Sequence, residues 1–204
     1  MLTALAAALS VAGLAVAVFA LTGHEPSPPS AAMQVPSAVK TSVPKLTIDP
    51  QASALKRSQP LRVRIPAIGV SAPVMKVGLD SSGSVQVPPL DNHNLLGWYK
   101  YGPTPGQRGA SVILGHVDSV TGASVFFNLK NLHKGDKVYV TLADGKTAAF
   151  AVDGLQNTPK TTFPSEAVYG KFGYAGLRLI TCGGAFEQAA GHYVDNIIVY
   201  AHLV

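Results

Sequence analysis

Leu177-Arg-Leu-Ile-Thr-Cys-Gly-Gly184 is the stretch on which the fold depends. A short apolar run ends at Cys182, the only cysteine of the chain, and two glycines follow it. The run predicts a buried strand, and the glycines predict a sharp turn that a substrate backbone can approach. A second strand-like run, Ser111-Val-Ile-Leu-Gly-His116, ends in a histidine. We expect the two strands to lie side by side and to bring His116 to Cys182.

Short strand patterns recur at near-regular spacing over residues 61–204, with turn residues between them and little helical periodicity. Leu61, Val63 and Ile65 alternate with arginines, which predicts a strand with one face in water. Further strands are expected at 72–78, 84–88, 110–116, 137–142, 147–152, 177–182 and 193–201. Short helical pieces are expected within 90–101, 125–132 and the long loop 156–173. These patterns predict an all-β domain, an eight-stranded closed barrel with short helices and long loops.

The N-terminal part differs in composition from the rest of the chain. Leu2 to Thr22 is apolar and carries no charge, and at about 1.5 Å per residue it could cross a hydrocarbon core of about 30 Å. We therefore expect a transmembrane anchor at 1–23, a Pro/Ser/Ala-rich disordered tether at 24–60 and a catalytic domain at 61–204. The expected location is a single-pass cell-membrane protein with its domain outside. A cleaved signal peptide is the alternative.

Composition excludes several classes of function. The net charge of +5 is modest, and the Lys and Arg residues are scattered without interleaved aromatics, so nucleic-acid binding is not expected. A single cysteine rules out an internal disulfide framework and a cysteine-rich zinc site. The acidic residues Asp80, Asp91, Asp118 and Glu166 are too dispersed for a calcium loop. We expect neither a metal nor a cofactor.

The chemistry expected at Cys182 is nucleophilic. A neutral thiol is a weak nucleophile, so it needs an imidazole that takes its proton and later protonates a leaving amine. His116 is preferred because it ends a buried-type strand, as Cys182 does. His192, in the loop that follows Cys182, is the second candidate for the base. An inert, structural cysteine is the remaining alternative.

A thioester also needs a donor for the oxyanion of its tetrahedral states. Backbone N–H groups near Gly183 could supply it, and so could an arginine. Arg178, Ile180 and Cys182 project from one face of the expected strand, with Arg178 about 13 Å from the thiol along the backbone. We expect Arg178 to line the groove, and a solvated charge at the strand edge is the alternative.

Three motifs together resemble the sortase family: Gly115-His-Val-Asp118, Leu179-Ile-Thr-Cys182 with its two glycines, and the run from Tyr193 to Ala201. The separation of the histidine and the cysteine, 182 − 116 = 66 residues, fits the same family. Within the family, the motifs most resemble the actinobacterial class F sortases, and the opening run, Arg64-Ile-Pro-Ala-Ile-Gly-Val, also resembles that class.

This resemblance implies a sortase-type barrel and a membrane-anchored cysteine transpeptidase of the Gram-positive cell wall. Such an enzyme cuts a Leu-Pro-any-Thr-Gly (LPXTG) sorting signal between Thr and Gly, holds the acyl group on Cys182, and passes it to an amine of a peptidoglycan precursor. His116 would be the acid and base, in a monomer. Thr181, beside the nucleophile, would help to orient the substrate or the oxyanion. The other substrate-binding candidates are Ile180, Gly183 and Asp118.

The sequence departs from the family pattern at one position. Sortases commonly carry an arginine just before the apolar run of the last strand, and Asn196 stands there in this chain. Asn196 would then fill the third catalytic role without a charge, or Arg178 or Arg64 would reach in. Two other functions remain open at this stage. One is an L,D-transpeptidase-like cysteine enzyme, and the other is a tethered module that binds the cell wall without catalysis.

Overall fold

A computed structural model describes residues 54–204 of the chain. The expected anchor at 1–23 and most of the expected tether lie outside the described residues. Within 54–204, none of the helices has the length and apolar character that a membrane crossing requires.

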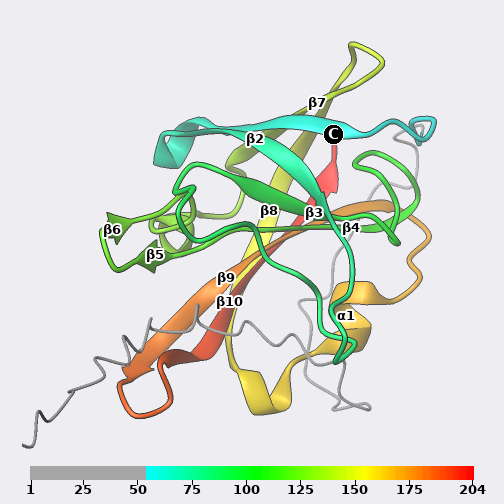
Figure 1. The fold of residues 1–204 in the computed structure, drawn as a ribbon. Helices are drawn as coiled ribbons and strands as arrows, with labels where there is room; N and C mark the ends of the chain where they lie inside the picture. The colour runs from blue at the N-terminus through cyan, green and yellow to red at the C-terminus, as the bar shows by residue number, and fades with distance from the viewer. Residues whose placement is uncertain (1–53) are drawn as a thin grey trace, which may run out of the picture.

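Eight strands close into a barrel in the order β1-β2-β3-β4-β9-β10-β8-β7, and β5 and β6 form a small separate pair (Figure 1). The prediction of an all-β, eight-stranded closed barrel is therefore confirmed. The strands are β1 (Pro60–Ile65), β2 (Val70–Val77), β3 (Leu96–Tyr99), β4 (Gly109–Leu114), β5 (Asp118–Ser119), β6 (Gly122–Ala123), β7 (Lys137–Leu142), β8 (Thr147–Pro159), β9 (Ala175–Glu187) and β10 (His192–Leu203). The helical pieces are η1 (Pro66–Ile68), η2 (Leu129–Asn131), η3 (Lys160–Thr162) and α1 (Ser165–Tyr169).

The two strands singled out in the sequence are neighbours. β4 and β9 pair in parallel over six residue pairs, from Gly109↔Ala175 to Leu114↔Ile180. β10 then pairs with β9 on its other side, antiparallel, and β8 pairs with β10. The prediction that the histidine strand lies beside the cysteine strand is confirmed.

Strand β9 is buried on both faces over its first nine residues. Leu177 and Leu179 pack in the barrel interior, whereas Ile180 belongs to a second apolar cluster with Phe163 and Val168. That second cluster lies between the outside of the sheet and the segment that carries α1, which explains why the strand reads as a continuous apolar run rather than as an alternating one.

Glycine is required at two places near the end of β4 and β9. A Cβ on Gly115 would lie 2.7 Å from a Leu96 methyl and 2.8 Å from a Val125 methyl, so only glycine fits between β4 and His116. Gly184 has a φ of +75°, a conformation that other residues rarely adopt.

Several local predictions were wrong. The residues of 90–101 form strand β3 instead of a helix, because Trp98 is buried in the barrel core and pairs with Ile113 of β4. Residues 84–88 make only the isolated bridge Leu79↔Val85. Leu61 breaks the expected alternation with 51% of its surface exposed, because the pairing of β1 with β7 shifts register there. The helix expected within 125–132 is reduced to η2.

The sharp turn expected directly after Cys182 is also wrong. β9 continues through Gly183 and Gly184 to Glu187, and the register with β10 shifts between Tyr193 and Asp195. The three residue spacings from Gly183 to Phe186 on β9 lie opposite the two from Tyr193 to Asp195 on β10. This is a β-bulge, a feature that commonly redirects a side chain. Cys182 is therefore held inside a long strand pair rather than at a free strand end.

Candidate active site

Cys182 lies at one end of a row of paired residues that crosses three strands, β9, β10 and β8. Its direct partner on β10 is Asn196, and Asn196 pairs on its other side with Thr158 of β8. Residues directly opposite one another in a sheet project from the same face. All three are buried, and the Cys182 side chain is 6% exposed. Asn196 therefore lies beside the nucleophile as expected, and its catalytic role stays a prediction.

His116 comes to the same end of the sheet from β4. Leu114 pairs with Ile180, and the Gly115 N–H donates a hydrogen bond of 3.1 Å to the Ile180 carbonyl. His116 is the next residue along the chain, and Cys182 lies two residues beyond Ile180, so both continue their strands at the same level. His116 is 6% exposed, like the cysteine.

The imidazole of His116 is held by a backbone carbonyl that sequence reasoning missed. Its Nε2 lies 2.7 Å from the Pro88 oxygen. A carbonyl can only accept, so Nε2–H is the donor, and Nδ1 is the nitrogen left to exchange a proton with a thiol. The Pro88 carbonyl therefore fixes the proton on Nε2 and leaves Nδ1 as the nitrogen that can accept one.

The thiol has a mixed electrostatic environment. Burial raises the pKa of Cys182, and the negative charge of Asp118 raises it further, whereas the positive charge of Lys160 lowers it. Lys160 belongs to η3, directly after β8. No local pattern in the sequence points to Lys160, because only the pairing of β8 with β10 brings η3 to the cysteine.

Asp118, an expected substrate-binding residue, lies close enough to act on the thiol and is itself held by Tyr193. The Tyr193 hydroxyl donates a short hydrogen bond to Asp118 Oδ2. Burial, followed by this hydrogen bond and by the Asp118 charge, raises the pKa of Tyr193 to about 12. The tyrosine therefore remains a neutral donor at neutral pH, and it anchors the Asp118 carboxylate beside the site.

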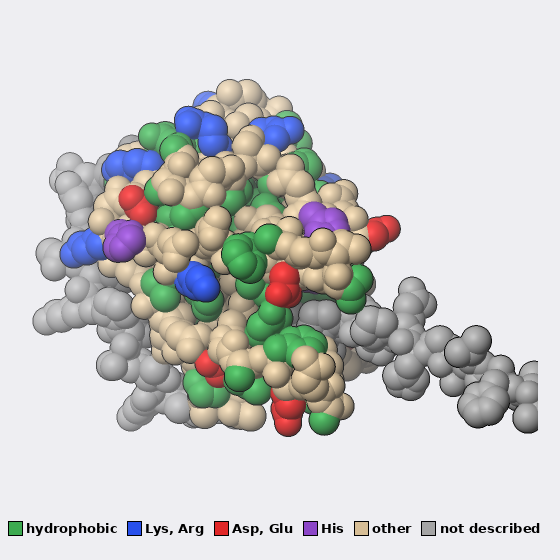
Figure 2. Space-filling model, turned by 90° about the vertical axis from the view of Figure 1, so that its left-hand side faces the viewer, with side chains coloured by type: hydrophobic (Ala, Val, Ile, Leu, Met, Phe, Trp, Pro, Cys, Tyr) green, Lys and Arg blue, Asp and Glu red, His purple; other side chains and the backbone are tan. Residues whose placement is uncertain are grey.

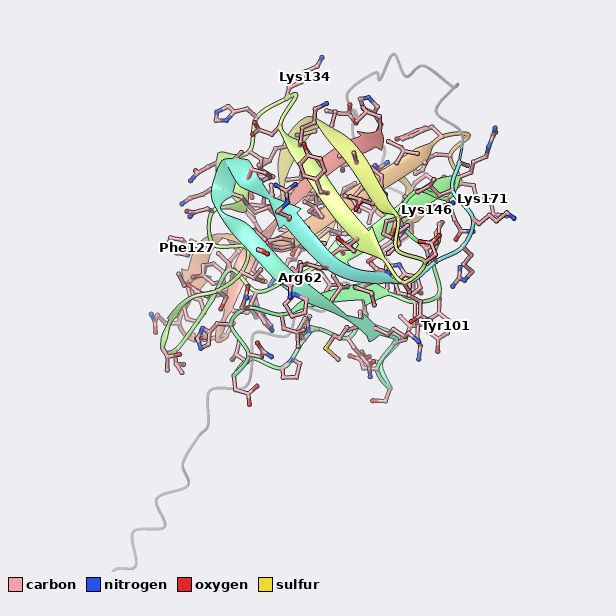
Figure 3. The ribbon with its side chains drawn as sticks, turned by 90° about the horizontal axis from the view of Figure 1, so that it is seen from above. Arg62, Tyr101, Phe127, Lys134, Lys146 and Lys171 are labelled. Carbon is pink, nitrogen blue, oxygen red and sulfur yellow. The ribbon has the colours of Figure 1, made fainter. Side chains whose placement is uncertain are left out.

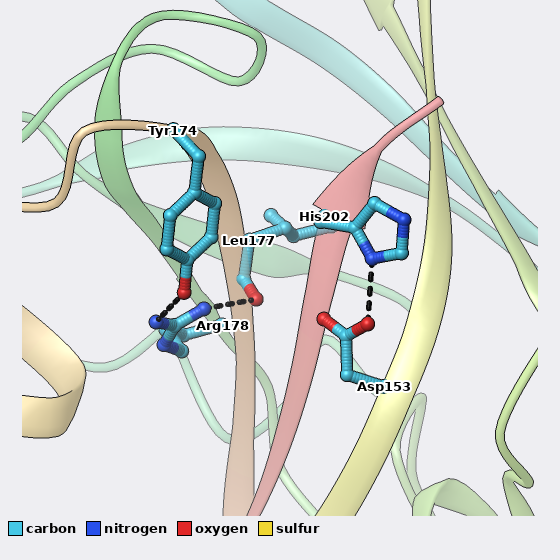
Figure 4. Close-up of polar contacts among 5 residues, drawn as sticks. All are labelled: Asp153, Tyr174, Leu177, Arg178 and His202. Atoms are coloured by element: carbon cyan, nitrogen blue, oxygen red, sulfur yellow. Dashed lines mark hydrogen bonds and ion pairs between the residues drawn. The ribbon is translucent and has the colours of Figure 1, made fainter. Parts of the chain in front are cut away.

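The expectation for Arg178 is corrected. Arg178 is 1% exposed, so it neither lines an open groove nor sits in solvent. Its guanidinium donates to the carbonyls of Ala167 and Leu177 and to the Tyr174 hydroxyl, at 3.0, 3.2 and 3.0 Å. It also stacks on the ring of Tyr200 at 4.8 Å. Figure 4 shows two of these hydrogen bonds. Arg178 ties α1 to β9.

Arg64 is also placed away from the thiol. β1, which carries it, stands four positions from β9 around the eight-stranded barrel, on the opposite wall. The Arg64 guanidinium lies 4.4 Å from the centre of the Tyr139 ring and is exposed. The idea that Arg64 reaches into the site is therefore wrong.

Two further substrate-binding candidates are buried in ways that the sequence did not show. Ile180 is 2% exposed and packs in the outer apolar cluster. Thr181 is 4% exposed, and strand alternation turns it to the face of Leu179, toward the barrel interior, where its hydroxyl has no hydrogen-bond partner within the described chain. Gly183, also buried, directly follows the thiol on the strand and pairs with Asp195.

His192, the second candidate for the base, is too far along the strand pair. It pairs with Glu187, five residues beyond Cys182, which corresponds to about 16 Å at the rise of a strand. Its Nδ1 contacts the Tyr193 carbonyl at 3.0 Å. His116 is therefore the histidine that the fold brings to the cysteine.

A cavity of about 460 Å³ lies elsewhere, at the start of β4. Tyr99, Arg108, Tyr169 and Phe172 are among the residues that line it. Its position corresponds to the opposite end of β4 from His116, so this cavity is separate from the cysteine site. Across residues 54–204, no three His, Cys, Asp or Glu side chains gather as a metal site would require.

Several solved sortases share the fold of this chain. The chain resembles sortase C1 of Streptococcus agalactiae, solved in complex with MTSET, at a TM-score of 0.56 and 21% identity, covering 72% of this chain and 70% of that one. It resembles sortase A of Corynebacterium diphtheriae at 0.55 and 22%, covering 73% and 62%. Sortase C-1 of Actinomyces oris gives 0.54 and 25%, covering 70% and 72%. A search of curated proteins found no match.

The fold and the cysteine–histidine arrangement therefore define a sortase-type cysteine enzyme. The family model for the sortase domain matches residues 63–204, and the chain belongs to the sortase family. It is a cysteine transpeptidase, for which the family implies sorting-signal substrates and an amine nucleophile. This membership sets aside both the L,D-transpeptidase and the non-catalytic wall-binding module.

Proposed function

We propose that this protein is a class F sortase that cleaves an LPXTG-type sorting signal between Thr and Gly. The observation that carries the proposal is the convergence of His116 and Cys182, from paired strands, at one end of the barrel. The Gly-His-Val-Asp and Leu-Ile-Thr-Cys motifs support the choice of class.

In the first half-reaction, His116 Nδ1 takes the thiol proton of Cys182, and the sulfur attacks the carbonyl carbon of the substrate threonine. The Thr–Gly C–N bond breaks, and the leaving amine takes the proton from the imidazolium. The product is a thioester between the threonine acyl group and the sulfur.

In the second half-reaction, an amine of a cell-wall precursor attacks the thioester carbonyl. The C–S bond breaks, the new amide forms, and the proton lost by the amine passes through His116 back to the sulfur. Backbone N–H groups around Gly183 are our proposed donors to the oxyanion of both tetrahedral states.

We further propose that residues 1–23 anchor the enzyme in the cell membrane as a single span and that 24–60 is the tether. The absence of charge in Leu2 to Thr22 and the Pro/Ser/Ala-rich composition that follows support this arrangement. The catalytic domain would then work as a monomer outside the cell, at the site of wall assembly.

The test incubates the full-length protein, in a mild detergent, with an LPXTG peptide and an oligoglycine amine. Mass spectrometry should detect the ligated peptide and, at short times, a thioester adduct on Cys182. The Cys182→Ala variant should form neither product while unfolding at the same temperature as the parent. Product formation by the folded Cys182→Ala variant would contradict the proposal.

A further inference from the structure

No arginine of this chain reaches the nucleophile. All five arginines lie within the described residues, and each has partners away from Cys182. Arg57 and Arg108 contact loop groups near the start of β4. Arg62 and Arg64 are on β1, and Arg178 is buried under α1. The positive charge that a sortase arginine usually provides therefore has to come from another side chain.

Lys160 is the cation at the site. Pro159, the residue before it, ends β8 opposite Asp195 of β10, so η3 begins beside the Asn196–Cys182 pair. Lys160 Nζ is shielded from solvent and has no hydrogen-bond partner of ordinary geometry among residues 54–204. The group it faces is the Cys182 thiol, whose pKa it lowers.

A buried ammonium without an anionic partner is costly, so its persistence needs a physical reason. The nearby carboxylates have other partners: Tyr193 donates to Asp118, and the Asn157 amide donates to Asp195 at 2.8 Å. The remaining group that can become an anion beside Nζ is the thiol itself. The ammonium is therefore satisfied when Cys182 is a thiolate, and it is unpaired when Cys182 is a neutral thiol.

We propose that Lys160 is a catalytic residue of this enzyme, one whose ammonium pairs with the Cys182 thiolate in place of the family's arginine. This inference rests on the proposed function. Lys160 stabilises the sulfur anion both when His116 removes the thiol proton and when the amine expels the sulfur from the thioester. Since an ammonium has no lone pair, Lys160 does not itself attack the thioester.

The test measures two properties of the full-length protein. The first is the rate of Cys182 alkylation by iodoacetamide as a function of pH, which requires no substrate. The groups that face the thiol in this titration are Lys160, Asp118, Tyr193 and His116. The second is the initial rate of ligation of the LPXTG peptide to the oligoglycine amine.

In Lys160→Met, the midpoint of the alkylation rate against pH should shift to higher pH by about one unit or more, because the thiolate loses its counter-charge. The ligation rate at neutral pH should fall about tenfold or more with it. Lys160→Arg should recover most of both properties. Lys146→Met is the matched control, since Lys146 is exposed in the turn between β7 and β8, on the opposite side of the molecule from Phe127 (Figure 3). The Phe127 segment adjoins His116 through the bond from the Phe126 N–H to the His116 carbonyl.

The outcomes separate the two proposals. If the parent ligates the peptide while folded Lys160→Met keeps the parental profile and rate, the role of Lys160 is overturned and the sorting reaction stands. If the parent forms no product while the profile shifts in Lys160→Met, the charge pair stands and the sorting reaction is overturned. Acylation of Lys160, found by peptide mass spectrometry, would make it a nucleophile and overturn its role as a counter-charge. If Lys160→Met does not fold, Lys160→Gln takes its place.

Discussion

Two cations lie at the two ends of the buried part of β9, Arg178 on the strand itself and Lys160 on η3 beside it, and their surroundings are opposite. Near the start of β9, Arg178 donates to three oxygens and stacks on Tyr200, so its guanidinium is fully engaged. Four residues further along the same face, the Cys182 thiol meets Lys160, whose ammonium has no ordinary partner within the described chain. Both cationic groups are shielded from water, and only one is satisfied by the resting fold.

The difference separates a cation that stabilises the fold from a cation that takes part in the reaction. A buried charge whose hydrogen bonds are complete stabilises a single conformation. A buried charge without a partner lowers the stability of the fold, and such destabilising groups are common at functional sites. The sequence presented Arg178 as an arginine on the same strand face as the cysteine, and the completeness of its contacts removes it from the chemistry.

The largest expected effect is that of removing the base, His116, which lies at the Cys182 end of β9. His116→Ala should lower the ligation rate by about 10²–10⁴-fold, because no other group is in place to move the thiol proton. Initial rates under saturating amine, together with the thermal unfolding temperature, measure it. A folded variant that keeps its rate would assign the base to another residue.

Substitution of Arg178, at the other end of the buried part of β9, should change the stability of the domain rather than its reaction rate. Arg178→Met should lower the free energy of unfolding by about 3 kcal/mol, because the Ala167 carbonyl loses its charged donor inside the protein. The ligation rate per folded molecule should stay near that of the parent. Urea unfolding followed by tryptophan fluorescence measures the change, and a loss of rate without a loss of stability would contradict this structural role.

A third change tests the interior side of the same strand. Thr181→Val replaces a buried hydroxyl that has no partner within residues 54–204 by a methyl group of similar size. The free energy of unfolding should rise by about 1 kcal/mol, because a desolvated polar group is removed. The same urea titration detects it. A decrease in stability would mean that the hydroxyl forms a hydrogen bond in solution.

The smallest expected effect concerns the negative charge near the thiol. The Asp118 charge raises the pKa of Cys182, so Asp118→Asn should shift the alkylation profile to lower pH, by about half a unit. This sign is opposite to that expected for Lys160→Met, which makes the two variants internal controls for each other. A shift to higher pH in Asp118→Asn would show that its carboxylate does not act on the thiol through charge.

One face of the domain mixes side chains of different charge and polarity. Figure 2 shows the face that carries β5 and β6, on which basic, acidic and apolar side chains are interspersed. A face of this kind offers no continuous positive track for a phosphate backbone.

Much of the fold was readable from local pattern. The apolar runs at β4 and β9, the hairpin of β7 and β8, and the spacing of turns sufficed for an eight-stranded barrel, because strand alternation and turn chemistry are properties of neighbouring residues. Strand β3 was misread as a helix, since its aromatic residues carry no period of two and its strand state depends on pairing with β2 and β4.

By itself, the sequence determined that Cys182 and His116 each follow a strand-like apolar run, and it predicted that the two strands are neighbours. Only the tertiary structure decided which charges surround the sulfur. Lys160 arrives across two strand pairings, Asp118 is fixed by a tyrosine 75 residues away, and Arg178 is removed by contacts with α1. The reason is physical: charge–charge interactions and hydrogen bonds act through space, and register across the barrel, rather than order along the chain, sets those separations.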